Sequence, residues 1–228
     1  MKKFIYSLVL CAIAAIPAFA QETVTVYDGD ATNAYVPIYG FYCDAFNKCE
    51  FIMPSDDLTE LQDATITKMV WYLGTVPEAV WGGNFQIYLK EVAENVASTS
   101  FYGTDGATLV YEGPIDATSG TVEIELANDF TYEGGNLLVC VYQVEKGTYK
   151  SATFVGAAAT GAAVSNYSYS SLEAITGGTI RDFLPKTTFE YIPSSGVVYY
   201  KPKNLQVTPV LTMPLLLGML VPTRLLGL

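Results

Sequence analysis

Short apolar runs separated by turn residues dominate the chain from residue 23 to residue 192. The segment TVEIEL at 121–126 places three aliphatic side chains on one side and Glu123 and Glu125 on the other, which is typical of a strand with one buried face. Runs rich in Val, Ile, Thr, Tyr and Phe begin near residues 23, 34, 49, 64, 84, 107, 120, 136, 149 and 186. The pattern predicts an all-β fold, an antiparallel two-sheet sandwich of jelly-roll type with about ten strands.

Three segments refine this prediction. The run NLLVCVY at 136–142 is apolar on both faces and predicts a central strand, covered on its second side by a loop at 157–163. At most one short helix is predicted, at Ser55–Leu61, with Ser55 as its N-cap after Pro54. Alternation along residues 64–74 predicts an inward-facing set of Thr67, Met69, Trp71 and Leu73.

The first twenty residues have the composition of a secretory signal peptide. Two lysines precede an apolar stretch too short to span a membrane, and Ala18–Ala20 forms a small-residue cleavage site. A membrane anchor fits less well, because Pro17 interrupts the stretch near its end. A lipid anchor on Cys11 also fits less well, because the bulky Leu10 precedes it. We therefore expect cleavage after Ala20 and a secreted or cell-surface protein.

Composition narrows the possible functions. The chain has no histidine, which excludes Ser/His/Asp and Cys/His nucleophile pairs and the HExxH zinc helix. Loss of residues 1–20 leaves 10 basic and 23 acidic side chains, a net charge of −13. Such an acidic chain lacks the clustered Lys and Arg needed to bind nucleic acid or anionic membranes. We expect neither a nucleic-acid partner nor a transmembrane span in the mature chain.

Three cysteines follow the signal peptide. Cys43 and Cys49 flank DAFNK, interpreted as a tight connection between two strands, so a disulfide across this hairpin is predicted in an oxidising compartment. Cys140 lies inside LLVCVY and is interpreted as a small buried apolar residue. Because the chain has no CxxC pair, a four-thiolate zinc site is not expected.

The composition changes near residue 193. We divide the chain into a signal peptide (1–20), a β-sandwich module (21–192), a linker (193–203) and a truncated domain start (204–228). In KPKNLQVTPV, Pro202, Leu205 and Val207 resemble the Pro-x-x-Leu-x-Val opening of a fibronectin type III repeat. The apolar residues beyond Pro209 lose this pattern, and shifting the implied codons by one base permits a more repeat-like sequence. The hypothesis is a frameshift near Pro209, and the alternative is a natural apolar tail.

Between about residue 34 and residue 191 the chain contains, in order, the segments YVPIYGFYCDAFNKCEFIM, ITKMVWYL, NFQIYLKEV, LVYEG, YEGGNLLVCVY and GTYKSATF. This order of segments resembles the β-sandwich modules of secreted or surface-attached proteins of Gram-negative bacteria, which often precede fibronectin type III repeats. The resemblance implies an adhesin-like or glycan-handling role in a multidomain parent and carries no catalytic signature.

Two acidic segments were weighed as chemical sites. Glu123, Glu125 and Asp129 do not match the Glu-x-Asp-x-x-Glu spacing of jelly-roll glucanases, and alternation alone explains the first two, so the protein is not expected to be an enzyme. Asp28 and Asp30 supply oxygen atoms at alternate positions, as calcium loops do, but the segment lacks the later glycine and glutamate of an EF-hand. A weak Ca²⁺ site is the possible cofactor, and a simple turn is the alternative.

Aromatic residues give the better functional hypothesis. The chain has 17 Tyr, 11 Phe and 2 Trp. Trp81 lies in the glycine-rich loop VWGGN, and Tyr167 and Tyr169 lie in the polar segment SNYSYSS, so these three are predicted to bind a glycan or protein at the cell surface. The alternative is that these rings cap the core, which would fit a structural spacer or assembly subunit. A carboxylate-dependent glycoside hydrolase is the second alternative.

Overall fold

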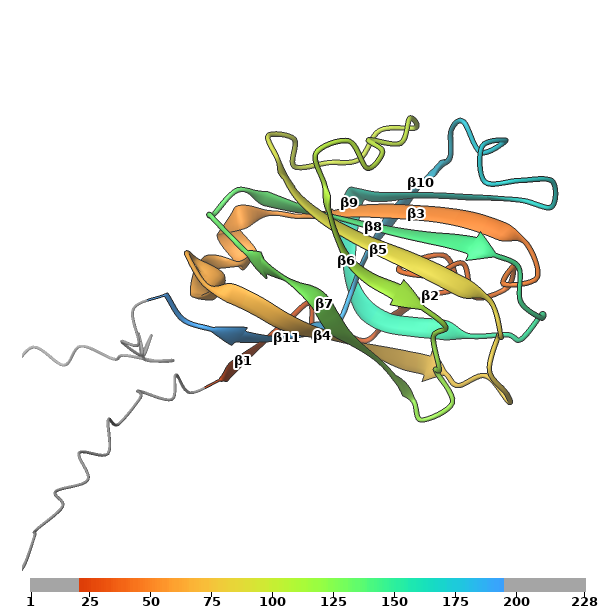
Figure 1. Cartoon of the computed structure of the whole chain (residues 1–228), viewed down its shortest axis with the longest axis horizontal. Coiled ribbons are helices and arrows are strands. Elements are labelled where there is room, and N and C mark those ends of the chain that lie inside the picture. The colour runs from red at the N-terminus through yellow and green to blue at the C-terminus, as the bar shows by residue number, and fades with distance from the viewer. Residues whose placement is uncertain (1–20, 195–228) are drawn as a thin grey trace, which may run out of the picture. The chain divides into compact units, whose positions relative to one another are not determined.

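The computed structural model describes residues 21–194, and these residues form an all-β fold of antiparallel strands (Figure 1). The predicted all-β, antiparallel class is therefore confirmed. The strands are β1 (Glu22–Val26), β2 (Ala31–Asn33), β3 (Phe46–Met53), β4 (Thr65–Thr75), β5 (Asn84–Val92), β6 (Thr108–Gly113), β7 (Thr121–Thr131), β8 (Asn136–Glu145), β9 (Thr153–Ser168), β10 (Thr179–Pro185) and β11 (Thr187–Ile192).

The strands belong to one continuous hydrogen-bonded sheet that curls around the core. One group runs β1-β11-β4-β7, and the other runs β6-β5-β8-β3-β9, with β2 and β10 also paired to β9. The two groups are joined where the end of β4 pairs with the start of β9, at Leu73 opposite Phe154. Because β4 and β9 are shared in this way, the sheet turns from one layer into the other without a break.

The run that begins near residue 149 predicts only the start of the long strand β9, and a loop was predicted at 157–163. The loop prediction was wrong, because these residues lie inside β9. Apart from Thr160 the segment consists of Ala and Gly, which have low strand propensity and give no alternation. Small side chains are nevertheless required here, since a Cβ at Gly156 would overlap the backbone oxygen of Leu184 on β10. Gly161 has φ of +67° and lies between the start of β9, which pairs with β2 and β4, and its end, which pairs with β3. This conformation, which favours glycine, lets the strand bend there.

The main core lies between the two groups of strands. Trp71 on β4 packs edge-on against Phe51 on β3, with ring centroids 6.3 Å apart, and both side chains are fully buried. The predicted inward set on β4 is confirmed for Met69 and Trp71. At Thr67 the prediction was wrong, because a bulge shifts the alternation, so that Ile66 is buried and the Thr67 hydroxyl donates to the backbone oxygen of Glu190.

The predicted helix at Ser55–Leu61 is replaced by two short 3₁₀ turns, η1 (Ser55–Asp57) and η2 (Thr59–Leu61). Ser55 is not an N-cap, because Pro54 precedes the first turn and the Ser55 side chain makes no capping bond. Its backbone N–H donates instead to the side-chain oxygen of Asn136, 2.9 Å away. Leu58 and Leu61 are buried, so these turns close one end of the core.

The segment 34–45, of which residues 34–43 were predicted as a strand, is irregular. Its backbone closes on itself through turns, with the N–H of Gly40 bonded to the oxygen of Ala34. Val36 and Ile38 are fully buried, which explains the strand-like apolar pattern. Gly40 lies so close to Ala152 that a Cβ would fall 2.5 Å from its backbone oxygen. The segment therefore packs as a plug against the start of β9 rather than pairing as a strand.

A second, smaller core covers the outer face of β8, confirming that this strand is buried on both sides. Ile52, Leu138, Cys140 and Tyr142 form it, with Tyr102 and Leu172 packed over them. The cover comes from Tyr102 in the loop 93–107 between β5 and β6, and from Leu172 in the connection between β9 and β10 (Figure 1). The cover of β8 therefore comes from residues distant from it in sequence. The residues 157–163, which were predicted to cover it, do not.

The buried carboxylate of Glu50 fixes this covering loop. It accepts hydrogen bonds from the backbone N–H groups of Tyr102, at 2.6 Å, and Gly103, at 3.0 Å, and from the hydroxyl of Tyr142. Glu50 is completely buried, so these donors replace the water that the charge has lost. Gly103 has φ of +75°, a conformation that favours glycine and aims its N–H at the carboxylate.

Part of the predicted organisation lies outside the described residues. These are the signal peptide at 1–20, most of the linker at 193–203 and the repeat-like segment at 204–228. Within residues 21–194, no helix is both long and apolar enough to cross a membrane.

Replacing Glu50 by Gln is expected to lower the free energy of unfolding by about 3 kcal/mol, because an amide cannot accept from three buried donors. Urea unfolding measures this loss, and hydrogen exchange should accelerate at residues 93–107. The control is Glu112→Gln, since Glu112 is exposed and accepts only from Gln86; a change within about 0.5 kcal/mol is expected. Equal stability of the two variants would contradict the role given to Glu50.

Candidate functional site

Six aromatic side chains gather at the end of the sheet where β3 begins and β9 ends. We call this group the tyrosine surface; it comprises Tyr35, Tyr39, Phe41, Tyr42, Tyr167 and Tyr169. Tyr42 and Tyr167 are stacked, with ring centroids 3.7 Å apart and planes 10° from parallel. Tyr169 meets Tyr167 nearly at a right angle, with centroids 5.7 Å apart. The rings therefore form one connected network.

Strand register and the plug segment bring these rings together. Tyr167 lies opposite Asn47 in the pairing of β9 with β3, and the plug at 34–45 supplies the other rings except Tyr169. Below them the side chain of Asn47 bonds to that of Gln143, which donates to the backbone oxygen of Cys43 at 2.7 Å. This buried polar chain ties the plug to β3 and β8.

Arg181 on β10 fastens the plug from the other side. Its guanidinium carbon lies 3.9 Å from the ring centroid of Tyr35, and its nitrogens donate to Ser165 Oγ at 3.0 Å and to the Tyr39 hydroxyl at 3.2 Å. Burial raises the pKa of Tyr39, and the Arg181 cation partly opposes that rise. Through one ring contact and two hydrogen bonds, the guanidinium holds β9, β10 and the plug together.

The outer part of the tyrosine surface contains an acidic group. The buried oxygen Oδ1 of Asp44 has no hydrogen-bond partner among residues 21–194. The pKa of Tyr169 is raised by partial desolvation and by the adjacent Asp44 carboxylate, and that of Tyr42 is raised by its contact with the Tyr167 hydroxyl. Both phenols are therefore neutral hydrogen-bond donors at physiological pH. Lys146 lies at the rim, with Nζ 3.3 Å from the backbone oxygen of Tyr169.

Among the three predicted ligand-binding aromatics, the structure brings two together and separates the third. Tyr167 and Tyr169 both belong to the tyrosine surface, and the side chain of Tyr169 is 54% exposed. Trp81 is fully buried and donates its indole N–H to the backbone oxygen of Lys150, so its assignment to a binding surface was wrong. The glycine-rich loop around it bends inward, because Trp81 packs against Phe85 in the core.

Sequence reasoning missed the contribution of the plug. Tyr35, Tyr39, Phe41 and Tyr42 were assigned to a strand, and Arg181 and Asp44 were not considered. The spacing of four aromatics within eight residues, interrupted by Pro37 and Gly40, was the available signal. It indicates a folded-back segment rather than an extended one, since Gly and Pro end strands.

The predicted calcium ligands do not come together. The carboxylate of Asp28 lies 2.6 Å from the ammonium of Lys186, and both Asp28 and Asp30 are exposed. Across residues 21–194 no group of three acidic or cysteine side chains is placed to hold a metal ion. The alternate acids belong to the turn between β1 and β2, closed by a bond from the N–H of Gly29 to the oxygen of Tyr27.

The predicted Cys43–Cys49 disulfide is absent, and both residues are free buried thiols, as is Cys140. The interpretation of DAFNK as a hairpin was wrong: Cys43 lies in the plug, whereas Cys49 lies within β3. The Cys43 thiol donates to the backbone oxygen of Tyr39, with its sulfur 3.6 Å away. Burial raises the pKa of all three thiols, which makes them unreactive.

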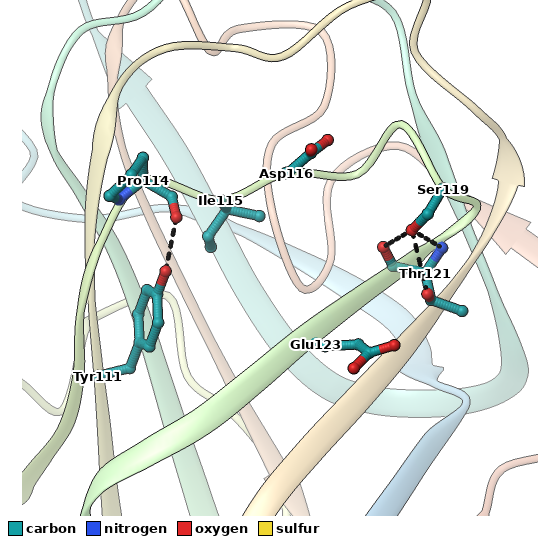
Figure 2. A pocket seen from close by; sticks show the side chains of 7 residues that line it. All are labelled: Tyr111, Pro114, Ile115, Asp116, Ser119, Thr121 and Glu123. Atoms are coloured by element: carbon teal, nitrogen blue, oxygen red, sulfur yellow. Dashed lines mark hydrogen bonds between the residues drawn. The ribbon is translucent and has the colours of Figure 1, made fainter.

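A shallow hollow of about 300 Å³ lies at the connection between β6 and β7 (Figure 2). It is lined by Tyr111, Pro114, Ile115, Asp116, Ser119, Thr121 and Glu123. Its polar groups are bound locally: the Tyr111 hydroxyl donates to Pro114, and Asp116 accepts from Thr118, which lowers the pKa of Asp116. The hollow therefore offers few open groups to a ligand, and the tyrosine surface is the stronger candidate.

Glu123 and Glu125 are paired with a lysine on the outer face of the sheet. Lys68 Nζ lies 2.7 Å from Glu123 and 2.9 Å from Glu125, with Glu190 at 3.7 Å. The side chains of Glu123 and Glu125 are 57% and 75% exposed, so neither lies in the enclosed cleft that a general acid requires. Their alternation along β7 is explained by this ion-pair cluster.

Comparison with known proteins adds no relative. No family model, curated protein or solved structure matches the chain. The adhesin-like resemblance is therefore neither supported nor opposed, and the function has to be argued from the geometry of the site.

For protein that begins at Gln21, thiol titration with Ellman's reagent is expected to find no rapidly reactive group in the native state and three after unfolding. The physical reason is the burial of all three sulfur atoms. The mass of the unreduced protein should match three free thiols. A single reactive thiol after unfolding would mean that two cysteines are joined and would contradict the assignment.

Replacing Arg181 by Lys is expected to lower the free energy of unfolding by about 2 kcal/mol, because one ammonium cannot stack on Tyr35 while bonding to both Ser165 and Tyr39. The tyrosine ring resonances of the surface should shift in NMR spectra. Lys150→Met is the matched control: it removes the exposed pair with Glu78, worth about 0.5 kcal/mol. Unchanged ring resonances in Arg181→Lys would refute the fastening role.

Proposed function

We propose that the protein is a non-catalytic module outside the cell that binds a glycan or a protein through the tyrosine surface. The observation that carries this proposal is the 54% exposed Tyr169 ring, held in contact with the stacked Tyr42 and Tyr167. An aromatic ring combines an apolar face with a polar hydroxyl, which suits both sugar stacking and protein contact.

The sequence-level expectations complete this proposal. Residues 1–20 would export the chain, and the module would stand in front of fibronectin type III repeats in a larger surface protein of a Gram-negative bacterium. The fold of the module would be a sandwich of jelly-roll type, which is supported by the two groups of strands around one core. The tyrosine surface lies where β3 begins and β9 ends, at the opposite end of the sheet from the end of β11 (Figure 1).

A structural spacer is the competing function. The face-to-face contact of Tyr42 with Tyr167 favours it, because rings that pack on each other also cap a core. The hydrolase alternative has less support, since Glu123 and Glu125 are exposed and paired with Lys68.

The proposal predicts that Tyr169→Ala weakens binding at least about tenfold, as for a central aromatic contact. Labelled protein is applied to an array of glycans and extracellular proteins, and the affinity of each hit is measured by titration. Tyr149→Ala is the matched control, because Tyr149 is 57% exposed and belongs to none of the ring contacts of the surface. Its affinity should stay within about twofold of the original.

Two outcomes would count against binding through the tyrosine surface. One is an array without any hit, which favours the spacer. The other is a hit whose affinity falls equally in Tyr149→Ala and Tyr169→Ala, which places the contact elsewhere. The melting temperature of each variant is measured alongside, so that unfolding is not mistaken for lost binding.

A further inference from the structure

We infer that the ligand of the tyrosine surface is an uncharged sugar ring of a glycan, with Asp44 accepting hydrogen bonds from its hydroxyl groups. The inference rests on the proposed function, since it names the ligand class of the same site. Three features of the surface carry it: an acceptor oxygen without a partner, the arrangement of the ring faces and the prior engagement of the nearby cations.

The unpaired acceptor oxygen of Asp44 favours a ligand that brings hydrogen-bond donors. Asp44 Oδ1 is shielded from solvent and unbonded within residues 21–194, which is costly for a carboxylate oxygen. The Tyr169 ring lies beside this carboxylate and is half exposed, and exposed side chains change rotamer within nanoseconds. Rotation of Tyr169 would open Asp44 to a ligand hydroxyl and place the ring face beneath the sugar.

The ring faces suit a flat sugar better than a cation. A cage for an ammonium group needs several aromatic faces turned toward one point. Here the faces of Tyr42 and Tyr167 are turned toward each other, 3.7 Å apart, and the guanidinium of Arg181 already covers Tyr35. The exposed ring of Tyr169 therefore acts as a single platform, against which the apolar C–H face of a sugar can stack.

The Asp44 carboxylate opposes an acidic sugar. Arg181 is directed to Ser165 and Tyr39, and Lys48 to the backbone oxygen of Ile175, so neither is aimed at a ligand beside Asp44. Lys146 at the rim is directed to the backbone oxygen of Tyr169. A carboxylated or sulfated sugar would face the Asp44 carboxylate, in a chain with 23 acidic and 12 basic side chains. An uncharged sugar meets no such repulsion.

In the test, three groups of probes are titrated into the full protein, and the tyrosine ring signals are monitored in NMR spectra. The neutral probes are maltohexaose, cellohexaose, mannohexaose and an N-acetylglucosamine oligomer; the acidic probes are oligogalacturonate and heparin fragments; the cationic probe is an oligolysine peptide. At least one neutral oligosaccharide should shift the rings of the tyrosine surface in a saturable way. Tyr149 should not shift, as an internal control.

Two substitutions at Asp44 then separate a hydroxyl acceptor from a charge partner. Asp44→Ala removes the acceptor and should weaken binding of the neutral sugar about tenfold, whereas Asp44→Asn keeps an acceptor oxygen and should cost no more than about threefold. A cationic ligand would lose similar affinity in both variants, because both remove the charge. Melting temperatures show whether each variant is folded.

Each result decides the inference. Saturable binding of a neutral oligosaccharide with the expected Asp44 pattern supports it. Binding of only the acidic or the cationic probes, or a neutral sugar that is insensitive to Asp44→Ala, overturns it. If no oligosaccharide shifts the rings but an array protein still depends on Tyr169, the sugar inference fails while the proposed binding function survives.

Discussion

The guanidinium of Arg181 holds together the three segments from which the tyrosine surface is made. It bonds to Ser165 on β9, stacks on Tyr35 and bonds to Tyr39 in the plug, while belonging itself to β10. A planar group with donors in a fixed fork can do all three at once. Without it the plug would lose its contact with β10, and the rings it carries would lose their fixed positions relative to Tyr167.

The rest of the fold provides the frame for this contact. β9 is 16 residues long and pairs with β2, β3, β4 and β10, so it joins the two groups of strands and ends at the tyrosine surface. On the outer face, the Glu50 carboxylate secures the loop 93–107 over β8 and keeps this central strand dry. Two charged side chains thus secure the frame: the cationic Arg181 at the plug and the anionic Glu50 under the outer loop.

The sequence pattern was a good guide wherever alternation alone decides the structure. The faces of β7 and most of β4 follow from it, as does the double burial of β8. It failed where small residues or long-range contacts decide. The Ala and Gly residues of β9 show no alternation of apolar and polar side chains. On β4, the bulge beside Ile66 turns Thr67 away from the core. The plug has a strand-like composition because it is buried, although its backbone turns back on itself.

The same distinction applies to the candidate site. Tyr167 and Tyr169 could be identified from a polar segment that cannot bury every ring, whereas Trp81 could not be placed, because a glycine-rich loop can bend inward as well as outward. Pairings between distant residues, such as Arg181 with Tyr35 or Cys43 with the backbone of Tyr39, depend on the folded plug. Such pairings leave no pattern in the local sequence. A disulfide was therefore predicted where the structure has free thiols, and a calcium turn where it has an ion pair.

Our central proposal is that a ligand binds at the tyrosine surface. The hollow beside β7 is not expected to bind it, because its polar groups are already hydrogen-bonded to one another. Hydrogen exchange of the protein, compared with and without its strongest array ligand, tests this claim directly. We expect added protection only in the plug at 34–45 and at residues 165–170, where β9 ends. Protection at residues 111–123 or at the loop 93–107, with the plug unchanged, would contradict it.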